Sequence, residues 1–232
     1  MNKKSGLQLY YSRVFFLRSE IDRLLTLSML FSCLLVLTRI AYTGRLTFVF
    51  LIWNLFLAFV PWSISQWLMR KPKWTESKIK FIFCFLVWLA FVPNSFYILT
   101  DLYHLGDNYN DYRMPDWYDL AMILSFAWNG LLLGIMSVRQ MEKIVQSRFF
   151  KKHELLFLYP VMWLNALGVY IGRYLRYNSW DVLTDPFQLI RGIAHILLHP
   201  LEYRYASGMI CCFSILLTLF YLTVKKMSKA IR

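Results

Sequence analysis

The sequence predicts an all-α, polytopic membrane protein with about six transmembrane helices and one short amphipathic helix at the membrane interface. Of the 232 residues, 58% are hydrophobic and 17% are charged, with a mean hydropathy of +0.44. That composition excludes a disordered chain, a collagen and a nucleic-acid-binding arm. Several separate apolar runs reach the ~20 residues that cross a hydrocarbon core of roughly 30 Å. In lipid such runs must be helical, because the solvent cannot satisfy backbone amides.

Six apolar runs are long enough to span, and short polar segments separate them. They cover approximately Leu24–Tyr42, Leu46–Met69, Ile79–Leu99, Tyr118–Val138, Leu155–Tyr174 and Tyr205–Val224. Basic residues precede the first run, but no small-x-small cleavage pattern follows it, so we expect this run to be retained. No low-complexity tract or linker divides the chain, which predicts a single membrane domain over residues 1–232.

The formal net charge of +13 reflects topology rather than affinity for nucleic acid. Counted on alternate sides of the six runs, 19 of the 26 Lys and Arg residues fall on one side, together with both termini. Eight of the 13 acidic residues fall on the other side. The positive-inside rule therefore predicts that the N-terminal segment 1–23 and the C-terminal tail 225–232 are cytoplasmic.

The segment Phe187–His199 lies between two prolines and is too short to span a bilayer. Its polar positions recur at helical spacing opposite apolar ones, which predicts an amphipathic helix. We expect it to lie in the outer interface, and a re-entrant placement is the alternative.

Two predicted spans contain an internal proline within a shared sequence of five residues. The repeats are Leu57–Pro61 and Leu89–Pro93, on neighbouring helices that cross the membrane in opposite directions. Such a pair occurs in inverted-repeat transporters, and it also arises when two helices merely share a kink. Three asparagines, Asn54, Asn129 and Asn165, lie near mid-span, where we expect interhelical hydrogen bonds.

Ionisable residues gather at the outer ends of the third and fifth spans. Asn94, Tyr97, Asp101 and His104 follow one another at spacings of 3, 4 and 3 residues, which places them on one helical stripe. Two interpretations remain open. Either Asp101 pairs with Arg173 or Arg176 and ties helix ends together, or the arginines hold a phosphate or headgroup while Asp101 or His104 acts as acid or base.

Metal chemistry has weaker support. His195 and His199 are one helical turn apart and Glu202 follows, an arrangement that resembles a two-histidine and carboxylate site without an HExxH motif. The acidic segment from Asp107 to Asp119 lacks the order of a calcium-binding loop. No nucleotide-binding or nucleophile-elbow motif is present in the sequence, and it identifies no cofactor.

The same polar segments resemble a family of bacterial integral membrane proteins known as domain of unknown function 1361. The resemblance rests on Phe91–Asn94, Tyr97–Leu105, Trp117–Leu120 and Gly168–Val182. It implies a bacterial plasma membrane location and about six helices, and it carries over no established activity. It also implies functional roles for the positions that match its pattern. These are Asn94, Tyr97, Asp101, His104, Asp119, Arg173, Arg176, Asn178, Trp180 and Asp181.

From these observations we expect an outward-facing polar pocket between the third and fifth spans and the Trp117–Asp119 start of the fourth. The hypothesis is that it binds an anionic lipid of the cell envelope, such as a phospholipid or a polyprenyl phosphate, with Asp101 and His104 as candidate acid and base. A small transporter or flippase and a non-catalytic scaffold remain alternatives. Six helices would need a homodimer to surround a transport pathway.

Overall fold

The computed structural model describes residues 6–106, 114–148, 154–175, 186–199 and 201–230, and these residues form helices without strands. In chain order the elements are α1 (Gly6–Thr43), α2 (Phe50–Arg70), α3 (Pro72–Glu76), α4 (Lys78–Tyr97), the 3₁₀ helix η1 (Ile98–Gly106), α5 (Asp116–Arg148), α6 (Glu154–Tyr174), α8 (Pro186–Leu198) and α9 (Arg204–Ala230). Six segments are long and apolar enough to cross a membrane. The protein is therefore an all-helical, multi-pass membrane protein, as the sequence predicts.

The helix boundaries agree with the predicted runs at the fifth span and differ at the second and the fourth. The fifth span covers the predicted Leu155–Tyr174, whereas α2 begins at Phe50, after the predicted Leu46. Gly44 adopts a positive φ of 71° beyond the end of α1, and the chain then turns before α2. A glycine permits this backbone because it has no Cβ. Helix α5 continues to Arg148, well past the predicted end at Val138, because charged residues that limit a membrane span do not end a helix.

Two short elements were not predicted from the apolar pattern. Helix α3 begins at Pro72, where the missing amide proton costs no intrahelical hydrogen bond. The nine-residue η1 continues α4 in 3₁₀ geometry. In that geometry residues three apart lie on the same side, so the predicted α-helical stripe changes its period at Ile98. A 3₁₀ segment of this length is uncommon and is typical of a strained or functional position.

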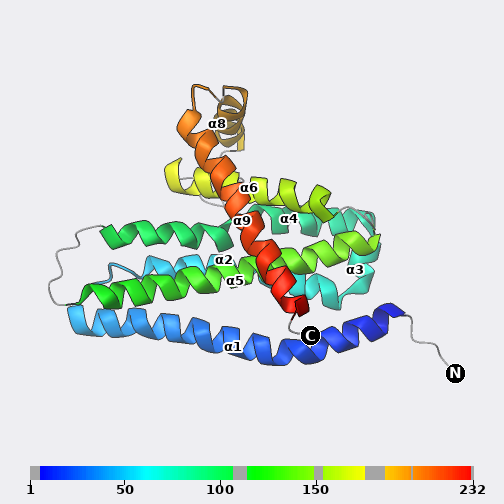
Figure 1. Cartoon of the computed structure of the whole chain (residues 1–232), viewed down its shortest axis with the longest axis horizontal. Coiled ribbons are helices and arrows are strands. Elements are labelled where there is room, and N and C mark those ends of the chain that lie inside the picture. Colours follow the sequence, from blue (N-terminus) through cyan, green and yellow to red (C-terminus); the bar gives the residue numbers. More distant parts are fainter. Residues whose placement is uncertain (1–5, 107–113, 149–153, 176–185, 200, 231–232) are drawn as a thin grey trace.

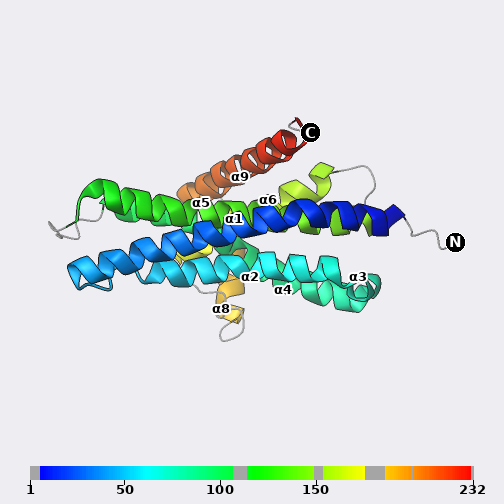
Figure 2. The ribbon, with the colours of Figure 1, turned by 90° about the horizontal axis from the view of Figure 1, so that it is seen from below.

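The central helices run side by side along the long axis of the molecule (Figure 1). Helix α5 contacts α1, α2, α4 and η1, while α6 packs on α4 and α9 packs on α6. Helix α9 crosses the other helices steeply in Figure 1 and at a smaller angle in Figure 2, and α8 contacts α9 near its start (Figure 1). We call the two ends of the bundle the η1 end, where α1 ends and α5 begins, and the α3 end, where α2 ends and α4 begins.

Glycines of α5 and α6 let these two helices approach α4 closely. A Cβ added to Gly130 would lie 2.7 Å from the Ser95 carbonyl oxygen, and one added to Gly134 would lie 2.8 Å from the Phe96 ring. A Cβ on Gly168 of α6 would lie 2.6 Å from Pro93. Small residues at these positions permit close packing in a membrane, where apolar burial does not drive helices together.

Two of the three mid-span asparagines make the predicted interhelical hydrogen bonds. Asn129 donates to the Ser32 hydroxyl of α1 at 2.9 Å, and Asn54 donates to the Asp101 carboxylate of η1 at 2.9 Å. The prediction is wrong for Asn165, which donates to the Val161 carbonyl of its own helix at 2.8 Å. A side chain can reach the carbonyl of the preceding helical turn without any partner helix.

Candidate functional site

The predicted acid of the site, Asp101, is buried where α2, η1 and α6 meet. Its side chain is 1% exposed. Asn54 donates to Oδ2 at 2.9 Å, and Arg173 Nη1 lies 3.9 Å from Oδ1. The contact between Arg173 and Asp101 is therefore an ion pair, and its distance is too long for a hydrogen bond. Of the two arginines considered as partners, Arg173 lies within ion-pair distance of Asp101, and the carboxylate makes its hydrogen bond to Asn54.

Arg173 connects α6 to η1 through two further contacts. Nη1 lies 3.2 Å from His104 Nε2, and the guanidinium carbon lies 5.3 Å from the centroid of the Tyr103 ring. The His104 ring packs edge-on against Phe50 of α2, with centroids 5.2 Å apart. The Arg173 side chain is 20% exposed, whereas Asp101 behind it is closed off. The arrangement therefore presents a cation and an imidazole at the accessible side of a buried carboxylate.

The remaining predicted site residues are placed differently. Asn94 donates to the Phe91 carbonyl of its own helix at 3.0 Å, and Tyr97 packs against the apolar core. Arg176, Asn178, Trp180 and Asp181 lie outside the described residues.

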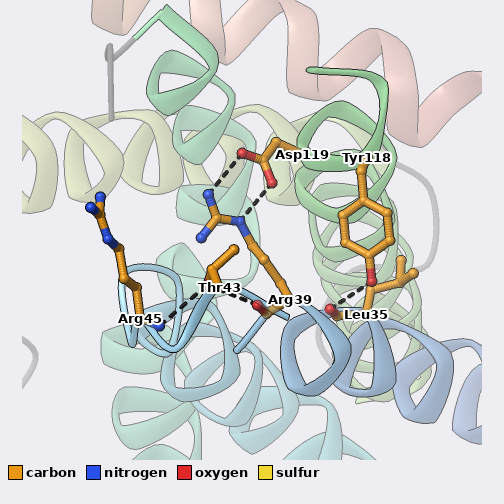
Figure 3. Close-up of polar contacts among 6 residues, drawn as sticks. All are labelled: Leu35, Arg39, Thr43, Arg45, Tyr118 and Asp119. Atoms are coloured by element: carbon orange, nitrogen blue, oxygen red, sulfur yellow. Dashed lines mark hydrogen bonds and ion pairs between the residues drawn. The ribbon is translucent and has the colours of Figure 1, made fainter. Parts of the chain in front are cut away.

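Asp119 forms its ion pair with α1, and not with the arginine described on α6 (Figure 3). Arg39 Nε donates to Oδ1 at 2.7 Å and Nη2 donates to Oδ2 at 3.0 Å, which is a bidentate pair. The guanidinium also lies 4.4 Å from the centroid of the Phe48 ring. One residue earlier, the Tyr118 hydroxyl donates to the Leu35 carbonyl at 2.9 Å. These contacts fasten the start of α5 to the last turns of α1.

Arg39 was not identified from the sequence as the partner of Asp119. The available signal was an arginine inside the first apolar run, because an ionisable residue in a span normally has a nearby partner. The same turn shows why α1 ends there. The Thr43 hydroxyl donates to the Arg39 carbonyl at 2.8 Å and accepts from the Arg45 amide at 3.2 Å (Figure 3). These two hydrogen bonds span the turn at Gly44.

A second buried polar cluster, also missed, joins α5 to α9 toward the α3 end. Glu142 is 1% exposed and accepts from Lys225 Nζ at 2.7 Å and from the Tyr221 hydroxyl. Arg139 Nη1 lies 3.7 Å away, and Gln146 donates to the same carboxylate at 3.3 Å. Tyr221 and Lys225 are four residues apart, which places both on one face of α9. That spacing in α9, together with an acid in α5 far from Asp116 and Asp119, was the signal in the sequence.

The weak metal candidate gains no support from the structure. The segment predicted as a helix over Phe187–His199 is helical over Pro186–Leu198, and the His195 and His199 rings stack with centroids 4.6 Å apart. Across the part of the chain that the structure describes, no three His, Cys, Asp or Glu side chains are placed to hold a metal ion. The position of this helix at a membrane interface stays a prediction.

Comparison with known proteins identifies the family. Neither the curated proteins nor the solved structures contain a significant match to this chain. A family profile described as Protein of unknown function (DUF1361) matches residues 53–223. The match includes Asn54, Asp101, His104 and Arg173, and it begins after Arg39. The chain belongs to the DUF1361 family of proteins of unknown function.

Proposed function

We propose that the cluster at the η1 end binds the anionic headgroup of a membrane lipid, either a phospholipid or a polyprenyl phosphate of the cell envelope. The observation that carries this proposal is the position of Arg173. Its guanidinium contacts His104 at 3.2 Å and stays 3.9 Å from Asp101, while a fifth of the side chain is exposed. A phosphate could accept two hydrogen bonds from such a planar fork.

The comparison with Arg39 supports this assignment. Both arginines lie at the η1 end, yet Arg39 is 2% exposed and both arms of its fork bind Asp119. Arg173 has no bidentate partner among the residues that the structure describes. A purely structural arginine is expected to resemble Arg39. We therefore assign the structural role to Arg39 and the ligand-binding role to Arg173.

In this proposal Asp101 and Asn54 position the site rather than meet the ligand. The carboxylate is closed to the surface and holds the guanidinium by charge, while Asn54 fixes its orientation from α2. The η1 end faces outward and both termini are cytoplasmic, in a bacterial plasma membrane. Asp101 and His104 are also the groups that could transfer a proton, so an enzyme acting on the bound lipid is the second candidate.

The test is native mass spectrometry of protein extracted gently from its own membrane. We expect a phosphate-bearing lipid on the unmodified chain, its loss from Arg173→Ala, and partial retention by Arg173→Lys, which keeps the charge without the fork. Arg204→Ala is the matched control, because Arg204 is exposed, lies over the neighbouring Tyr205 ring and forms no ion pair with a residue that the structure describes. Equal lipid on all four proteins refutes the proposal.

The two alternatives give different results in the same experiment. If the cluster is a scaffold, Arg173→Ala lowers abundance and thermal stability, and the surviving protein keeps its lipid. If the protein is an enzyme, Asp101→Asn and His104→Gln keep a bound lipid whose mass differs from that on the unmodified chain.

A further inference from the structure

A groove of about 420 Å³ opens between α2, α3 and α4 near the α3 end. Trp67 and Trp74 form one wall with their rings edge to face, 4.8 Å between centroids. Phe83 and Val87 of α4 also line the groove, and Ser63 is the lining residue of α2 that is farthest from Arg70. The lining side chains are apolar apart from the Ser63 hydroxyl, the Cys84 thiol and the indole N–H groups of Trp67 and Trp74.

The groove extends from the polar end of the bundle into the membrane-spanning part. Ser63 precedes Arg70, the last residue of α2, by seven residues, and Val87 follows Lys78, the first residue of α4, by nine. At 1.5 Å per residue these separations correspond to a depth of about 10 to 13 Å. Both helices are long and apolar enough to span a membrane, so we expect the inner part of the groove to lie at hydrocarbon depth.

The mouth of the groove is strongly basic. Five exposed cations surround α3 against the single acid Glu76: Arg70, Lys71, Lys73, Lys78 and Lys80. None of the five makes an ion pair with a residue that the structure describes. Lys80 Nζ lies 5.4 Å from the centroid of the Trp74 ring, which places an ammonium group directly on the groove wall.

We propose that this groove binds an anionic phospholipid, with one acyl chain along Trp67 and Val87 and the headgroup phosphate near Lys80. An acyl chain forms no hydrogen bonds, so an apolar lining can bury it. Clustered cations at a membrane boundary attract anionic headgroups. A second copy of this chain fits poorly, because symmetry would bring the same five cations together. The site is separate from the η1 end and does not depend on the function proposed there.

Trp67 is a reporter inside the groove, because bromine atoms on an acyl chain quench a tryptophan that they touch. The full-length protein is reconstituted in phosphatidylcholine vesicles that contain dibrominated phosphatidylglycerol or dibrominated phosphatidylcholine. Subtracting the signal of Trp67→Phe isolates the Trp67 emission. We expect phosphatidylglycerol to quench it at several-fold lower mole fraction, and Lys80→Gln to reduce that preference about fivefold, as for the loss of one surface cation.

Two further variants complete the test. Lys226→Gln removes an exposed charge from α9 and should leave the preference unchanged. Val87→Phe narrows the groove and should weaken quenching by both lipids. Equal quenching of the unmodified protein by the two lipids overturns the proposal. The proposal is also overturned if Lys226→Gln reduces the preference for phosphatidylglycerol as much as Lys80→Gln does, because the preference then reflects general surface charge. Undiminished Trp67 quenching in Val87→Phe overturns it as well. None of these results bears on Arg173, so the two proposals fail separately.

Discussion

The buried Glu142 cluster allows a quantitative test of how α9 is held to the bundle. Replacing Glu142 by Gln keeps the shape of the side chain and removes its charge, next to Lys225 Nζ at 2.7 Å. Removing one partner of a buried pair costs 3–5 kcal/mol. Lys225 is 6% exposed and can extend along its stem toward the helix end, which favours the lower figure. We therefore expect a loss of about 3 kcal/mol in the free energy of unfolding.

The assay is unfolding of the purified protein in mixed micelles with increasing SDS. Lys225→Met should cost less, about 2 kcal/mol, because Arg139 and the Tyr221 hydroxyl still contact the carboxylate. The Glu142→Gln/Lys225→Met double variant should also lose about 2 kcal/mol, well below the sum of the single losses. Glu20→Gln, the same change at an exposed position, should fall within about 0.5 kcal/mol of the unmodified protein. Additive losses in the cycle would refute the reasoning.

Three further changes test other contacts by the same unfolding assay. Gly134→Ala puts a Cβ 2.8 Å from a ring of α4 and should cost about 2 kcal/mol, whereas Gly208→Ala meets nothing within 4 Å; equal stability of the two would contradict the close approach. Asp119→Asn should cost about 1 to 2 kcal/mol, discounted because its side chain is 24% exposed, and an unchanged midpoint would mean that Arg39 does not hold α1. Asn129→Leu should cost about 1 kcal/mol through its lost interhelical hydrogen bond, and a gain in stability would count against that bond.

The helical architecture could be predicted because the bilayer leaves few choices. Apolar runs of spanning length must be helical, so composition and length alone indicated six membrane segments, and all six are present. The same argument could not show where a helix ends once it leaves the hydrocarbon, as α5 demonstrates by continuing to Arg148. It also could not foresee the 3₁₀ geometry of η1, since nothing in the apolar spacing distinguishes it from an α-helix.

The candidate site was predicted in part. Asp101, His104 and Arg173 were recognised as polar residues at the ends of apolar spans, and the structure brings these three together. The role of Asn54 as the hydrogen-bond donor to Asp101 was not recognised, because a mid-span asparagine carries no sign of which helix it faces. Glu142 was counted only as a charge outside the membrane, although the structure buries it against α9.

The sequence by itself determined which segments span the membrane and which side chains are too polar to face lipid. Only the tertiary structure decided which of these side chains are partners. Asp119 could have met an arginine of α1 or of α6, and it meets Arg39. The reason is physical: lipid tails are as apolar as the helix surfaces, so the apolar pattern does not set how each helix is rotated against its neighbours. Close contacts such as Gly168 against Pro93 set them instead, and those contacts exist only after the helices have packed.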